Sequence, residues 1–63
     1  MNRDQQSLLA AYDDQIKKLY AMLADGYTVA GGDLTQEQAA EQNFKRGVGI
    51  AQRARDRAVT LVS

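Results

Sequence analysis

Residues 26–35 read Gly-Tyr-Thr-Val-Ala-Gly-Gly-Asp-Leu-Thr, and they separate two long stretches in which apolar residues recur every three or four positions. Glycine adopts the positive φ that tight turns require, so Gly31 and Gly32 predict a reversal of the chain. The periodic stretches on either side predict helices. The sequence therefore predicts a mainly α fold. We expect a single domain, residues 1–63, built as an antiparallel two-helix hairpin with helices over about 4–25 and 36–62 and a turn over 26–34.

Two conformations are open for the connection. The first is a tiny β-hairpin in which residues 27–29 pair with residues 33–35, because residues 27–29 favour a β-strand and the following glycines favour a tight turn. An isolated two-stranded hairpin is marginally stable, so an irregular loop is the other. In both, Gly26 is expected to end the first helix, because glycine takes the left-handed conformation that often follows a last helical turn.

The first helix is expected to begin near Asn2 or Asp4, whose side chains accept hydrogen bonds from the free N–H groups of a helix start. Its apolar residues form a stripe with alternating steps of three and four, which predicts one face packed against the second helix. The stripe consists of Leu9, Tyr12, Ile16, Leu19 and Leu23, and it is widened by Leu8 and Tyr20.

The second helix is expected to start at a capping box formed by Thr35 and Gln38. Its stripe has the same spacing but consists mostly of small residues, which lets two helix backbones approach closely. The stripe is Ala40, Phe44, Gly47, Ala51, Ala54, Ala58 and Leu61. Close packing is the favoured reason for Gly47 and Gly49, since each costs about 1 kcal/mol in a helix interior. The alternative is a kink that interrupts the helix there.

A chain of 63 residues buries a modest share of its surface, so small domains often rely on disulfides, metals or oligomerisation. Cysteine and histidine are absent, which excludes disulfides and removes the common zinc ligands. We therefore expect a homo-oligomer or a larger protein assembly. The second helix, being longer, should extend past the first by one to two turns and offer apolar contacts there. The interface candidates are Tyr20, Phe44, Ala51, Ala58, Leu61 and Val62.

The eight basic and eight acidic residues balance, which argues against a general affinity for nucleic acid or anionic membranes. Their distribution is uneven. Residues 1–34 contain three basic and five acidic side chains, and residues 35–63 contain five basic and three acidic ones. This asymmetry suits antiparallel neighbours, within the hairpin or between subunits. The candidates for phosphate contact are Arg46, Arg53 and Arg57, which share one face of the second helix.

Nothing in the sequence predicts catalysis. Asp13 and Asp14 are adjacent, so they point about 100° apart on a helix, and Glu37 and Glu41 lack a second acidic cluster. The Gly31-Gly32 turn is not followed by the Lys-Ser/Thr of a phosphate-binding loop. We expect no catalytic, cofactor-binding or metal-binding residues and no enzyme activity. No apolar run approaches a membrane span and no signal-peptide pattern is present, which favours the cytoplasm, or a particle assembled there.

Residues 19–41, in which a helix is followed by Tyr-Thr-Val-Ala-Gly-Gly-Asp-Leu-Thr and a second helix, resemble the small head-completion proteins of tailed phages. The resemblance implies two helices with a short β-hairpin between them and a structural role at the head–tail junction of a virion.

The leading hypothesis is a non-enzymatic structural or assembly protein that acts through protein–protein contacts. One alternative is a dimeric helical-hairpin regulator that binds nucleic acid through the basic face of the second helix, by analogy with plasmid copy-number control proteins. The other is a small inhibitor or adaptor that docks on a larger protein.

Overall fold

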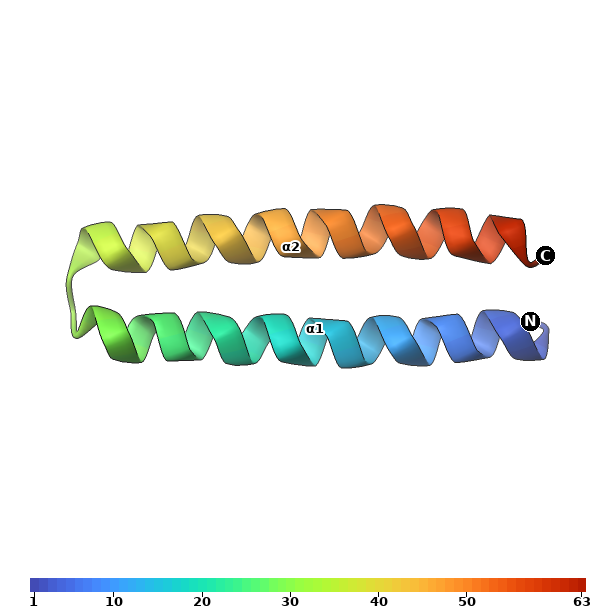
Figure 1. The fold of residues 1–63 in the computed structure, drawn as a ribbon, viewed down its shortest axis with the longest axis horizontal. Helices are drawn as coiled ribbons and strands as arrows, with labels where there is room; N and C mark the ends of the chain where they lie inside the picture. Colours follow the sequence, from blue (N-terminus) through green and yellow to red (C-terminus); the bar gives the residue numbers. More distant parts are fainter.

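The computed structural model describes all 63 residues and consists of two helices joined by a tight turn (Figure 1). Helix α1 runs Arg3–Ala30 and helix α2 runs Leu34–Leu61, with 28 residues each. They lie antiparallel and side by side in a rod that measures 45 × 15 × 10 Å. The predicted helical hairpin is thus confirmed. Neither helix combines the length and the apolar character needed to span a membrane.

The start of α1 is held by a reciprocal pair of hydrogen bonds. The Asn2 side chain accepts from the backbone N–H of Gln5 at 2.8 Å, and the Gln5 side chain accepts from the backbone N–H of Asn2 at 3.1 Å. Two of the free donors of the first turn are satisfied in this way. Of the two residues expected to start the helix, Asn2 is the cap.

The prediction that α1 ends at Gly26 is wrong. Gly26 continues the helix, and the chain leaves it at Gly31, which has a left-handed φ of 56° and donates its N–H to the carbonyl of Tyr27. Gly32 also has a positive φ, of 92°. The β-propensity of residues 27–29 is overridden because one more helical turn can pack against α2. The tiny β-hairpin is therefore absent, and the turn is confined to residues 31–33.

The start of α2 also differs from the prediction. Asp33, not Thr35, caps the helix, and its carboxylate accepts a hydrogen bond from the backbone N–H of Gln36 at 3.1 Å. Aspartate is as good a cap as threonine or better, and its charge suits the positive end of the helix dipole. Because Asp33 directly follows the two glycines, the helix starts two residues earlier than expected.

Two glycines set the distance between the helices. A Cβ at Gly26 would lie 2.8 Å from the Cβ of Ala40, and a Cβ at Gly47 would lie 2.6 Å from a methyl of Leu19. Both separations are shorter than carbon atoms tolerate. At Gly26 the helices would have to move apart, because the Ala40 Cβ is fixed to its backbone, whereas at Gly47 the Leu19 side chain would have to shift. Close packing at Gly47 is thus confirmed. At Gly49 the space is open, and α2 continues through both glycines without a break.

The contact line on α2 drifts relative to the expected stripe. Ala51 lies at its centre and is only 2% exposed. Further along, Ala54 is exposed, and Arg55 takes its place as a half-buried residue. A straight α-helix has 3.6 residues per turn, so a seven-residue repeat rotates away from a fixed partner by about 20° per heptad. The expected stripe assumed strict heptad steps and therefore missed this exchange.

The expected overhang of α2 is absent. The helices have equal length because α1 is six residues longer than predicted. Their free ends are joined by two hydrogen bonds: the Asn2 amide donates to the carbonyl of Val62 at 3.1 Å, and the Gln5 amide donates to the carbonyl of Val59 at 3.5 Å. The hairpin is thus closed at both ends.

The two kinds of glycine predict opposite effects of alanine. Gly49→Ala should raise the free energy of unfolding by about 1 kcal/mol, the gain in helix propensity at an open site. Gly26→Ala should lower it, because the Ala40 contact must widen and overpacking costs typically 1–3 kcal/mol. Urea unfolding followed by circular dichroism, at one protein concentration, measures both. An equal gain in the two variants would contradict the close approach at Gly26.

Candidate protein-interaction surface

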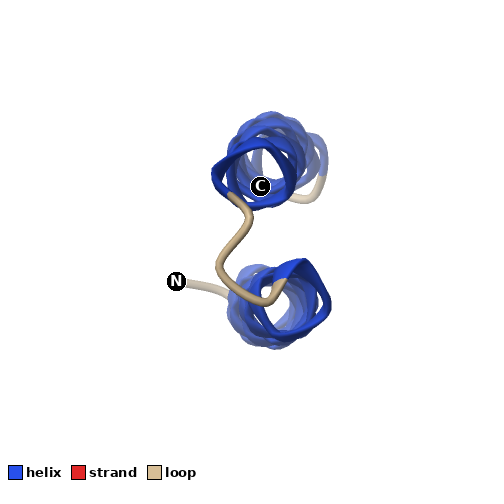
Figure 2. Cartoon of the chain, turned by 90° about the vertical axis from the view of Figure 1, so that its left-hand side faces the viewer, coloured by secondary structure: helices blue, strands red, loops and turns tan.

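The hairpin exposes more surface than a compact protein of its size. Its accessible surface is 4852 Å², whereas a compact monomer of 6.9 kDa is expected to expose about 4,000 Å². The surplus is therefore roughly 850 Å² on that scaling. Two helices can bury only the line along which they meet, and Figure 2 shows each helix with the other as its single neighbour. Only Ala30 and Ala51 are buried.

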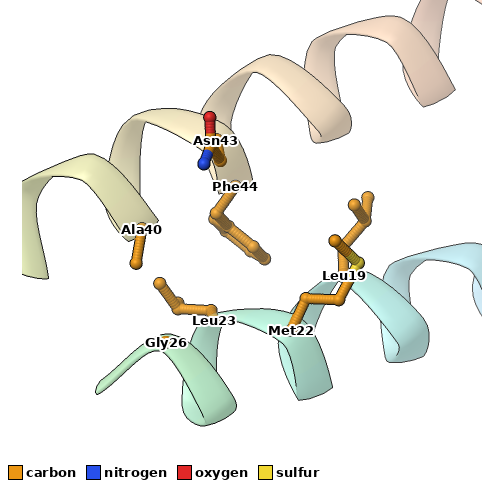
Figure 3. Close-up of a pocket in the computed structure, with 7 residues that line it drawn as sticks. All are labelled: Leu19, Met22, Leu23, Gly26, Ala40, Asn43 and Phe44. Atoms are coloured by element: carbon orange, nitrogen blue, oxygen red, sulfur yellow. The ribbon is translucent and has the colours of Figure 1, made fainter. Parts of the chain in front are cut away.

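The first part of the exposed apolar surface lies near the turn (Figure 3). Leu19, Leu23 and Phe44 fill the contact line, and the Phe44 ring projects from α2 toward α1. Beside them opens a hollow of about 140 Å³, whose outer wall includes Met22 and Asn43. Met22 is 65% exposed, so a long apolar side chain stands at the rim without cover.

A second hollow, of about 160 Å³, lies nearer the free ends. It is lined mostly by small and apolar residues: Leu8, Ala11, Tyr12, Gln15, Ala51, Ala54, Arg55 and Ala58. Leu8, Gln15 and Met22 follow each other at steps of seven, so both hollows open on the same side of α1. On α2, Asn43 and Ala54 are eleven residues apart, which is three helical turns and again one side.

This side of the hairpin, which we call the apolar face, has further members. Ile50 follows Asn43 by seven residues and Leu61 follows Ala54 by seven, so both project on the same side of α2. Ile50 is 50% exposed and Leu61 is 66% exposed. The apolar face thus consists of Leu8, Ala11, Gln15, Met22, Asn43, Ile50, Ala54 and Leu61. Its edges carry charge, because Asp4 and Lys18 are seven residues before and after Ala11, and Arg57 is seven residues after Ile50.

The opposite side of the hairpin is mixed in character, and a third hollow there is lined by Leu9, Tyr12, Asp13, Ile16, Lys17 and Arg55. There the hydroxyl of Tyr27 donates a hydrogen bond to the Glu41 carboxylate, which links the two helices near the turn. This bond is the main reason that the pKa of Tyr27 is raised above its ordinary value of 10.0, and the nearby negative charges of Glu41 and Glu37 act in the same direction. A phenolate beside a carboxylate would be repelled, so the neutral form is favoured.

Arg55 makes a contact that the sequence analysis missed. Its guanidinium lies 4.4 Å from the centre of the Tyr12 ring, a cation–π arrangement across the helices. Its Nε and a terminal nitrogen each lie 2.9 Å from one carboxylate oxygen of Asp56. The arginine stem therefore fills the position that strict heptad spacing had assigned to Ala54. The sequence could have indicated this contact if the stripe had been drawn for 3.6 residues per turn, because the contact line then moves from Ala54 to Arg55.

The expected interface residues separate into two groups. Phe44, Ala51 and Ala58 pack within the hairpin, on the contact line between α1 and α2. Tyr20, Leu61 and Val62 are exposed, by 66%, 66% and 37%. Of these three, Leu61 belongs to the apolar face. Met22 and Ile50 were not among the expected residues, because each lies one position beside the apolar stripe of its helix and not on it.

The three candidate phosphate-binding arginines are all exposed on α2. Arg46 and Arg57 are four residues before and seven residues after Ile50, so they border the apolar face, and Arg53 lies farther toward the back of the helix. None of the three makes a salt bridge in the hairpin. The two salt bridges present join neighbours on one helix, Lys17 with Asp14 at 3.9 Å and Arg55 with Asp56. No ion pair crosses between α1 and α2.

No group of three or more histidine, cysteine, aspartate or glutamate residues is placed to hold a metal ion. No protein-family model, curated protein or solved structure matches this chain. The surface chemistry of the hairpin itself is therefore the basis for the functional argument.

The Tyr27–Glu41 hydrogen bond predicts a pH dependence at the alkaline end. The folded state holds the phenol proton more tightly than the unfolded state, so this stabilisation is complete below about pH 10 and is lost as the pH rises through the raised pKa. In an ultraviolet titration of phenolate absorbance, the tyrosine that ionises at the highest pH should be Tyr27. That step should disappear in Tyr27→Phe and move to lower pH in Glu41→Gln. Tyr20→Phe, the matched control, should leave it in place. A late component that survives Tyr27→Phe would contradict the assignment.

Proposed function

We propose that this chain is a non-enzymatic assembly protein that acts through protein–protein contacts made by its apolar face. The observation that carries the proposal is that Met22, Ile50 and Leu61 are exposed on the side of the hairpin where the two hollows open. Monomeric proteins seldom leave large apolar patches uncovered, and such patches commonly mark sites of protein association. The surplus of exposed surface has the same explanation.

Contact with nucleic acid is supported less well than contact with protein. The arginines at positions 46, 53 and 57 are exposed and unpaired, but the net charge of the chain is zero. Nucleic-acid sites usually combine a strongly basic surface with aromatic or groove-fitting side chains. Here Arg46 and Arg57 border an apolar face, which is the arrangement of a protein interface with a charged rim.

A narrower version of the proposal makes the chain a head–tail joining component of a phage virion. It comes from the resemblance in residues 19–41 and stays a prediction. Residues 27–30 are helical, so the β-hairpin that the resemblance implied is absent. The apolar face therefore supports an assembly role in general more strongly than a role at the head–tail junction. Presence of the chain in purified particles would support the narrower version.

Site-specific photo-cross-linking in cells that produce the chain tests the proposal. A photoreactive side chain at Met22 lies on the apolar face, and one at the neighbouring exposed Ala21 lies on the outer side of α1. We expect protein adducts from position 22 and few or none from position 21. A third probe at Arg53 examines the nucleic-acid alternative.

Adducts to nucleic acid from position 53, with no protein adduct from position 22, would contradict the proposal and favour the regulator. Equal yields of protein adduct from positions 21 and 22 would show that the apolar face has no special role.

A further inference from the structure

We propose that the apolar face is a homodimer interface, in which two hairpins pack face to face about a two-fold axis parallel to their helices and form a four-helix bundle. The inference rests on the proposed function and names its partner as a second copy of the chain. Three properties of the hairpin favour this partner: the amount of uncovered surface, the shape of the face, and the distribution of charge between the two helices.

The uncovered surface matches what a dimer needs. A standard stable interface buries about 800 Å² on each partner, and the hairpin exposes roughly 850 Å² more than a compact monomer of its mass. Face-to-face pairing would therefore bring the exposed surface per chain close to that of an ordinary small domain. It would also supply the core that a two-helix chain of this length lacks.

The apolar face carries both protruding side chains and hollows, so two copies of it can complement each other. It presents large side chains, Met22, Ile50 and Leu61, and it also contains the two hollows of about 140 and 160 Å³. An apolar cavity of about 150 Å³ accommodates a benzene-sized group. Each copy thus offers both protruding apolar groups and spaces of a size to receive them, which is the condition for packing one helix layer on another.

Charge selects the direction of the two-fold axis. Helix α1 carries three basic and four acidic residues, and α2 carries five basic and three acidic ones. With the axis parallel to the helices, α1 of each copy faces α2 of the other, so unlike balances meet. With the axis across the rod, α1 would face α1 and α2 would face α2, so helices with the same charge balance would meet. Like charges in apposition are unfavourable.

A two-fold axis along the rod also fixes the register. Rotation about this axis leaves every residue at its own height, so pairing between copies repeats the pairing within each hairpin, where Leu19 meets Gly47 and Gly26 meets Ala40. Ala11 and Ala54, which line the same hollow, would each face the other residue on the second copy. With the axis across the rod, α1 instead meets α1, and positions near its middle, such as Gln15, approach their own counterparts.

Sedimentation equilibrium of the full chain over a wide concentration range tests the dimer. The expected mass is twice the 6.9 kDa of the chain. Met22→Lys should raise the dissociation constant roughly a hundredfold, because the two-fold axis places two lysines in the interface at about tenfold each. Ala21→Lys, the same change one residue away on the outer side, should have little effect. A monomer at every concentration would overturn the inference.

Disulfide trapping supplies a second measurement that does not depend on the stability of the lysine variant. The chain has no cysteine of its own, so single cysteines report one contact each. Mixing Ala11→Cys with Ala54→Cys under mild oxidation should give a covalent heterodimer, while Gln15→Cys alone should not link to itself. The opposite pattern would overturn the proposed axis, and no link in either case would overturn the interface.

The two proposals fail in different ways. If the chain is monomeric but a different protein is cross-linked from position 22 in cells, the apolar face is an interaction surface and only the homodimer is wrong. If the chain dimerises, but with Ala21→Lys as harmful as Met22→Lys, another surface mediates the association and both proposals fall.

Discussion

The close approach of the two helices at Gly26 and Gly47 is the constraint on which the rest of the hairpin depends. Each glycine admits a side chain of the other helix, Ala40 in one case and Leu19 in the other, and a Cβ would displace the Ala40 contact at Gly26 and the Leu19 side chain at Gly47. The approach brings Tyr27 within reach of Glu41 and Arg55 over Tyr12. It also explains why α1 continues through Gly26, since ending there would remove the last turn of contact with α2.

The same closeness limits what the hairpin can bury. Small residues on α2 let the backbones approach, but they contribute little apolar area per residue. The larger side chains, Met22, Ile50 and Leu61, are displaced to the flank and remain uncovered. A tight two-helix seam therefore leaves these three large apolar side chains exposed. This distribution is reasonable for a unit that completes its core by association and unfavourable for an isolated monomer.

The sequence predicted the hairpin, Asn2 as one of two residues that could cap α1, and the close packing at Gly47, because periodicity and capping chemistry are local signals. It did not predict the end of α1 or the start of α2. Gly26 can serve as a helix stop or as a packing site, and only the position of Ala40 on the other helix decides between them. The apolar face was missed for a related reason. Met22 and Ile50 lie one position to the side of the stripe, and their exposure depends on the rotation of each helix about its own axis.

The charges of the two helices are not paired across the seam. The two salt bridges each join neighbours on one helix, and no ion pair crosses between α1 and α2. The polar contacts that do cross near the seam are the Tyr27–Glu41 hydrogen bond and the Arg55–Tyr12 cation–π contact. Charges separated by more than a Debye length, about 8 Å at physiological ionic strength, are largely screened. In the proposed face-to-face dimer, α1 of each copy would also lie alongside α2 of the other. The unlike charge balances of the two helices would then meet between the copies as they do within each hairpin, while the apolar face is covered.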